Sequence, residues 1–119
     1  MTDRLRAELD RIIDAGAPAA DHATTALGDG PMMERLESAI RALAEHRGPD
    51  SSTCPSDAAR AVGGADWRDL MSDARDLARA LAKSGEVHIT QRGEIVDPDS
   101  AWRGPIRIRT TTEGPAERE

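Results

Sequence analysis

The stretch DWRDLMSDARDLARALAKSGEVHITQRGEIVD, residues 66–97, contains the change of hydrophobic period that decides the fold. In its first half, apolar side chains recur at the three- and four-residue spacing of an amphipathic helix, which Asp66 caps and Gly85 ends. In its second half, Val87 and Ile89 alternate with polar residues. The pair Arg92-Gly93 then separates this run from the next, as a tight hairpin turn does. The stretch therefore predicts a helix followed by an antiparallel hairpin.

Two further helices are expected before this stretch, and one strand after it. Residues 31–47 start with proline in the first turn, and residues 55–64 start with proline and stop at two glycines. The run PIRIRT, residues 105–110, follows the turn residue Gly104 and alternates isoleucine with arginine. Three helices followed by a small antiparallel sheet with a wing loop is the order of a winged helix-turn-helix, an α+β fold. The alternative is an unrelated small α+β domain.

We expect one core between these helices and the sheet. The third helix packs on the first in this prediction, and the strands close the core from one side. The residues expected in this core are Leu36, Ile40, Leu43, Trp67, Leu70, Leu77, Leu81, Val87, Ile89, Ile106 and Ile108.

The ends of the chain have a different character. Residues 3–14 carry apolar residues at helical spacing, whereas residues 15–30 mix glycine, proline and small residues without a period, which is typical of a flexible linker. We therefore predict an amphipathic helix and linker over residues 1–30, a winged-helix domain over residues 31–110 and a disordered tail over residues 111–119.

Composition restricts the function more than it defines it. The 119-residue chain has a net charge of -6, so any contact with nucleic acid must be local. One cysteine allows no intramolecular disulfide, and no apolar stretch is long enough for a membrane span, which together predict a cytoplasmic protein that does not insert into a membrane.

No motif predicts an enzyme, a metal site or a cofactor. His22, His46 and His88 lack the spacing that directs two imidazoles at one metal. Cys54 precedes Pro55 at a helix start, where a thiol can be activated, but a packing role is the favoured interpretation. The sequence has neither a nucleophile motif nor a phosphate-binding glycine loop.

Arginine placement provides the candidate binding residues. Two sets would lie on the third helix and on the wing, where guanidinium groups can contact the phosphates of duplex DNA. Asp69, Asp73 and Asp76 follow an adjacent helix face, so a neutralised solvent face remains the equal alternative for the helix. The candidates are Arg68, Ser72, Arg75 and Arg79 on the helix, and Arg92, Arg103, Arg107 and Arg109 on the wing.

Trp102, in the predicted wing loop, has two interpretations. It is either a lid over the small core, which is slightly favoured, or an exposed anchor for a protein partner.

Residues 53–109 carry nine basic and nine acidic side chains, so this region is less acidic than its flanks without being basic.

Four ordered motifs also resemble a known family. TCPSDAAR, WRDLM, ITQRGEIVDP and GPIRIR, within residues 32–109, are similar to a bacterial domain of unknown function with a winged-helix-like fold. In that family the domain sometimes follows a cysteine-rich zinc-binding module, which Cys54 alone cannot supply. The resemblance implies a fold and no catalytic residue. Two functions remain open: a DNA-binding or transcription-related module, which the fold's common use favours, and a protein-interaction module of the same fold.

Overall fold

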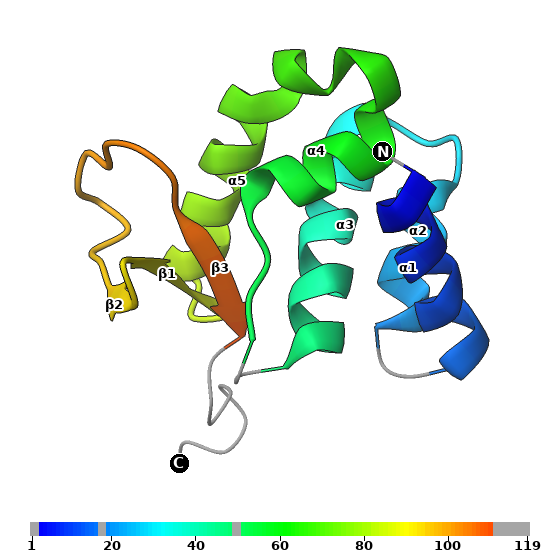
Figure 1. The fold of residues 1–119 in the computed structure, drawn as a ribbon, viewed down its shortest axis with the longest axis horizontal. Coiled ribbons are helices and arrows are strands. Elements are labelled where there is room, and N and C mark those ends of the chain that lie inside the picture. The colour runs from blue at the N-terminus through cyan, green and yellow to red at the C-terminus, as the bar shows by residue number, and fades with distance from the viewer. Residues whose placement is uncertain (1–2, 17–18, 49–50, 111–119) are drawn as a thin grey trace.

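The computed structural model describes residues 3–16, 19–48 and 51–110, and within them helices precede a small sheet (Figure 1). This α+β class agrees with the prediction. The predicted disordered tail, residues 111–119, lies outside the described residues. The elements are α1 (Asp3–Ala15), α2 (Ala20–Leu27), α3 (Met32–Arg47), α4 (Pro55–Gly63), the 3-10 helix η1 (Gly64–Leu70), α5 (Met71–Lys83), β1 (Val87–Gln91), β2 (Glu94–Ile95) and β3 (Arg107–Thr110).

The sheet is antiparallel with strand order β2-β1-β3. Gln91 pairs with Glu94 across the two-residue turn, in which Arg92 and Gly93 have φ values of 54° and 84°. Both values are those of the tight hairpin turn that the sequence predicts. On the other side of β1, Ile89 pairs with Ile108, and both side chains are buried.

A short segment before α4 extends this sheet. The backbone N–H of Thr53 donates to the Ile108 carbonyl at 2.8 Å, and the Ile108 N–H donates to the Thr53 carbonyl at 2.7 Å. The segment therefore runs along the free edge of β3, as Figure 1 shows. This contact ties the sheet to the start of α4.

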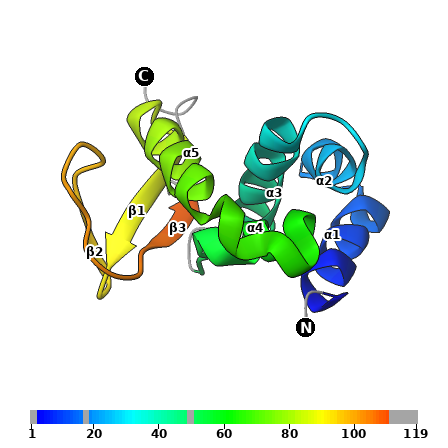
Figure 2. The ribbon, with the colours of Figure 1, turned by 90° about the horizontal axis from the view of Figure 1, so that it is seen from above.

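One continuous core runs from α1, α2 and α4 through α3 and α5 to the sheet, and the helices surround α3 (Figure 2). Most of the predicted core is confirmed, with Leu36, Ile40 and Leu43 of α3 fully buried. The prediction is wrong in degree for three residues, because Trp67, Leu70 and Leu77 are only half-buried and pack against the core from its edge. The remaining predicted core residues are buried, namely Leu81, Val87, Ile89, Ile106 and Ile108.

The third core helix begins later than predicted. Residues 64–70 form η1, in which Asp66 has non-helical backbone angles, and no side chain caps α5, so the predicted Asp66 cap is wrong. A Cβ atom on Gly63 would lie 2.8 Å from Leu70 Cδ1. The glycine thus lets Leu70 fold back onto the end of α4, and the chain turns tightly here before α5 starts.

The N-terminal residues are more ordered than predicted. Helix α1 is amphipathic as expected, with Leu5, Leu9 and Ile12 fully buried. The flexible linker is wrong for residues 20–27, which form α2 and pack on α3. Its buried face consists of Ala23 and Ala26, preceded by Ala19, so the helix contributes close packing without large apolar side chains.

A polar network joins α1 to α3 and α4. The Arg47 guanidinium donates to both carboxylate oxygens of Glu8, at 2.7 and 3.0 Å, and to Asp57 Oδ2 at 3.0 Å. Burial by itself would raise the pKa of Asp57, but the Thr53 hydroxyl and the charge of Arg47 outweigh burial and hold that pKa below its usual range. The network fixes α1 at the point where α3 ends and α4 begins.

Candidate nucleic-acid interface

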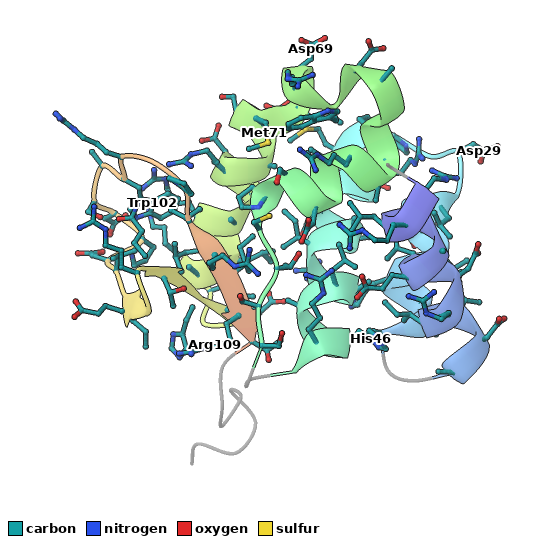
Figure 3. All side chains as sticks on the ribbon, viewed as in Figure 1. Asp29, His46, Asp69, Met71, Trp102 and Arg109 are labelled. Carbon is teal, nitrogen blue, oxygen red and sulfur yellow. The ribbon has the colours of Figure 1, made fainter. Side chains whose placement is uncertain are left out.

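The eight predicted nucleic-acid-binding residues come from η1, α5 and the sheet region, and the structure places them in several environments. Figure 3 shows the side chains on these elements, with Trp102 and Arg109 among those labelled. We call residues 96–106 the β2–β3 loop, which has no regular secondary structure. Whether each arginine faces this loop, the solvent or another side chain decides what it can contact.

Arg75 and Arg79 of α5 are bound to the β2–β3 loop. Arg75 donates to the carbonyl oxygens of Gly104 at 3.2 Å and Trp102 at 3.3 Å. Arg79 donates to the Ser100 carbonyl at 2.9 Å and also to that of Pro98. Both guanidinium groups are therefore occupied within the fold, and both residues are half-buried.

Trp102 lies between the loop and α5. Its ring centroid is 4.2 Å from the Arg79 guanidinium carbon and 5.7 Å from that of Arg75, both within cation–π range. Its indole N–H donates to the Asp97 carbonyl at 3.0 Å, and the residue is only 9% exposed. Trp102 thus covers the core as a lid, and its ring does not provide the exposed anchor considered as the other interpretation.

Arg68 and Ser72 are exposed near the start of α5. The Arg68 guanidinium lies 4.6 Å from the Trp67 ring centroid. Asp69 and Asp76 are exposed on the same stretch of η1 and α5. The helix therefore offers a mixed surface and no continuous positive face.

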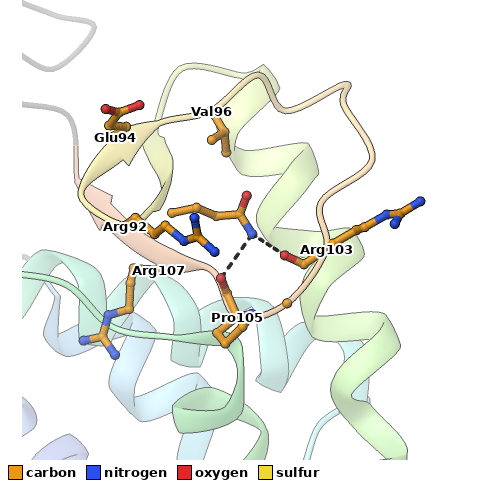
Figure 4. A pocket seen from close by; sticks show the side chains of 8 residues that line it. Arg92, Glu94, Val96, Arg103, Pro105 and Arg107 are labelled. Atoms are coloured by element: carbon orange, nitrogen blue, oxygen red, sulfur yellow. Dashed lines mark hydrogen bonds between the residues drawn. The ribbon is translucent and has the colours of Figure 1, made fainter.

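Arg92, Arg103 and Arg107 come together at the end of the sheet that carries the hairpin turn. They line one hollow of about 730 Å³ between the hairpin turn and the β2–β3 loop (Figure 4). The Gln91 side chain spans this hollow, because its Nε2 donates to the carbonyls of Arg103 at 2.7 Å and Pro105 at 3.2 Å. The complete lining is Gln91, Arg92, Glu94, Val96, Arg103, Gly104, Pro105 and Arg107.

The three guanidinium groups point in different directions. In Figure 4, Arg92 reaches across the hollow and Arg103 extends away from it. Arg107 turns to the side, where it donates to the Ser52 hydroxyl at 2.8 Å and the Ser52 carbonyl at 3.1 Å. Glu94 is the one acidic residue in the lining. The hollow therefore has a basic rim and no single point at which the arginines converge.

The remaining predicted residue, Arg109, stays apart from this rim. It is half-buried on β3 opposite His88. Sequence reasoning missed Gln91, whose role depends on carbonyls 12 and 14 residues away, so no local pattern marks it.

The other candidate chemistry is sparse in the described part of the chain. Cys54 is half-buried, with its Sγ 3.1 Å from Ser56 Oγ. Residues 3–16, 19–48 and 51–110 contain no group of three or more His, Cys, Asp or Glu side chains placed to hold a metal ion. Over the same residues, every helix is too short or too polar to cross a bilayer.

Comparison with known proteins gives one family. None of the curated proteins compared with the chain matches it. A family model described as "Protein of unknown function (DUF3253)" matches residues 33–111, which run from the start of α3 past the end of β3. The match leaves α1 and α2 outside and includes the hollow and the β2–β3 loop. Because it spans more than half of the chain, the protein belongs to this DUF3253 family of unknown function.

Proposed function

We propose that this domain is a winged-helix module that binds nucleic acid through phosphate contacts made by its wing, without catalysing a reaction. The wing is the β1–β2 turn together with the β2–β3 loop. The order of α3, α4 and α5 followed by a three-stranded antiparallel sheet supports the fold assignment. The observation that carries the function is the basic rim formed by Arg92, Arg103 and Arg107 around one hollow.

The arrangement of this rim suits an extended polyanion. Three convergent guanidinium groups would enclose a single phosphate, whereas groups that diverge from a common edge can contact successive phosphates of a strand. Arg92 and Arg103 are exposed, and neither guanidinium group has a hydrogen-bond partner among the described residues. They are therefore available to an incoming phosphate without breaking an existing contact, whereas Arg107 would first have to release Ser52.

The helix contributes less than in a base-reading winged helix. Arg75 and Arg79 are occupied by the loop, and Asp69 and Asp76 stand exposed nearby. A duplex approaching this face meets exposed carboxylates beside Arg68 and Ser72, so few side chains are free to read bases. The proposed module therefore binds the sugar–phosphate backbone of the nucleic acid with little dependence on base sequence, which is the electrostatic mode of protein–DNA contact.

A protein-interaction module of the same fold is the second candidate. Ile95 on edge strand β2 is 57% exposed, and its chain neighbours Glu94 and Val96 line the hollow. An exposed apolar residue on an edge strand is a feature of strand-pairing interfaces. Under this candidate the arginines of the rim would select an acidic partner.

A titration of a fluorescently labelled duplex, at about 50 mM salt to strengthen electrostatic binding, tests the proposal. The test variant is Arg92→Gln/Arg103→Gln, and the matched control is Arg4→Gln/Arg11→Gln, which removes the same charge from exposed positions of α1. We expect the wild type and the control to bind alike. The test variant should bind about tenfold or more weakly, with a salt slope shallower by about two units.

Two results would overturn the proposal. Absence of wild-type binding at this salt concentration would remove nucleic acid as the ligand and leave the protein-interaction candidate. Equal weakening of test and control variants would show that total charge, and not the wing, governs binding.

A further inference from the structure

The β2–β3 loop is fixed along most of its length, although it forms no helix or strand. Arg75 and Arg79 of α5, Gln91 of β1 and the loop's own Trp102 indole all donate to its backbone carbonyls. The accepting carbonyls belong to Asp97, Pro98, Ser100, Trp102, Arg103, Gly104 and Pro105. A loop held mainly through its carbonyls has a fixed backbone path, and its own Trp102 and Ser100 side chains add hydrogen bonds to the Asp97 carbonyl.

The donors on α5 are one helical turn apart, which matches the loop as it passes over the helix. Arg75 binds the end of the loop, at Trp102 and Gly104, and Arg79 binds its beginning, at Pro98 and Ser100. The Trp102 ring lies within cation–π distance of both. Each guanidinium thus makes two hydrogen bonds and one ring contact, a combination that a lysine ammonium does not reproduce.

We propose that Arg75 and Arg79 act as a latch that positions the wing and do not themselves contact the ligand. The latch holds Trp102 and Gly104 on either side of Arg103, and so sets where Arg103 stands on the rim of the hollow. The ligand in this inference is the one given by the proposed function. The latch itself rests only on the contacts between α5 and the loop. It reassigns two residues that the sequence places among the phosphate contacts.

Release of the latch would weaken binding without removing charge. A mobile loop must be ordered again when ligand binds, and that ordering opposes association. The variant Arg75→Lys/Arg79→Lys separates the two roles, because it keeps both positive charges and loses the paired hydrogen bonds. If these residues contacted phosphates directly, lysine would keep the charge that attracts the phosphate, and any loss of affinity would not depend on Arg103.

Two measurements on the full chain test the latch. The first uses Trp102 as the only tryptophan, in a Trp67→Phe background. The lysine variant should shift its emission to longer wavelength and make it more accessible to acrylamide, and Arg4→Lys/Arg11→Lys in the same background should change neither. Unchanged emission and quenching in the lysine variant overturn the latch, whether or not the protein binds DNA.

The second measurement is duplex affinity at about 50 mM salt. The lysine variant should bind about tenfold more weakly than the wild type, a change of the size expected when a bound loop must be ordered. Its salt slope should stay the same, because the phosphate contacts are unchanged. In an Arg103→Gln background the lysine substitutions should lower duplex affinity clearly less, since they act through Arg103.

The outcomes separate the two proposals. The positioning role is overturned if the wild type binds the duplex and the lysine variant binds it equally well although its loop is loosened. If the lysine substitutions lower duplex affinity equally in the presence and absence of Arg103, they do not act through Arg103. A wild type that does not bind removes the proposed function and the positioning role, while the fluorescence result still decides whether the latch exists.

Discussion

Replacing Arg47 with methionine should destabilise the protein more than removing any exposed arginine, because Arg47 joins three elements. Its guanidinium donates to Glu8 of α1, to Asp57 of α4 and, at 3.0 Å, to the Ser52 carbonyl. Methionine keeps most of the alkyl packing. The substitution therefore tests the polar contacts and not the volume.

The expected magnitude follows from the burial of the three side chains. Arg47, Glu8 and Asp57 are 18%, 12% and 14% exposed, so the two carboxylates would be left largely desolvated and without their cation. Removing one partner of a buried ion pair costs about 3–5 kcal/mol. Because water still reaches part of each group here, we expect about 3 kcal/mol, roughly a fifth to three-fifths of the stability of a typical domain.

The penalty should depend on pH with a definite sign. The pKa of Asp57 lies below its usual range in the folded protein, so its charged form stabilises the fold at neutral pH, and that stability is lost as the pH falls through the folded-state pKa. Without Arg47 the pKa of Asp57 is lowered less. The difference between wild type and variant should therefore be largest near neutral pH and shrink below about pH 4.

Urea denaturation followed by circular dichroism at several pH values measures this difference. Arg11→Met, an exposed arginine of α1, is the control and should change the unfolding free energy by less than about 0.5 kcal/mol. A loss below about 1 kcal/mol for Arg47→Met, or a loss independent of pH, would refute the reasoning.

Three further outcomes are expected. Leu81→Ala should cost about 2–4 kcal/mol in unfolding free energy and Leu77→Ala clearly less, since Leu81 is 4% exposed and Leu77 is half-buried; equal losses in urea denaturation would contradict this packing. Gly93→Ala should cost about 1–2 kcal/mol through backbone strain at φ 84° alone, because an added Cβ meets no atom within 4 Å, and thermal unfolding measures it. Glu94→Gln, which removes the acidic residue of the hollow, should tighten duplex binding about threefold at low salt, and the same charge change in Asp10→Asn on α1 should not.

The parts of the fold that sequence predicts are those with local causes. The hairpin follows from alternation on either side of Arg92-Gly93, and Gly85, Gly93 and Gly104 all have positive φ, as expected for a helix end and two turns. Burial on α3 follows from a regular spacing of large apolar residues. Each signal needs only a few neighbouring residues, so it can be recognised without the tertiary structure.

Helix α2 was missed because its buried face carries alanine only. Ala19, Ala23 and Ala26 have the spacing of a helix face, but small residues give little contrast with the polar residues between them. The neighbouring glycines and proline then favour a linker. Its helical state depends on close packing against α3, which a single sequence does not reveal.

The sequence predicted which arginines belong to the candidate site. It did not predict which of them are exposed and which bind the β2–β3 loop. Arg75 and Arg79 have the same spacing and chemistry as exposed helix arginines, yet their partners lie 19 to 29 residues away in the loop. Periodicity assigns a residue to a face of a helix. It does not say whether solvent or another segment covers that face.

The charge distribution sets how the proposed binding would occur. Residues 53–109 carry equal numbers of acidic and basic side chains, so the net charge of -6 resides in the flanking segments, which repel a duplex. Two arginines of the neutral region are already held in the latch. The attraction therefore comes from the exposed arginines of the wing, and repulsion elsewhere favours an approach in which the wing meets the strand first. Such binding rests on few phosphate contacts, so it should be weak at physiological salt unless a second copy or a partner adds contacts.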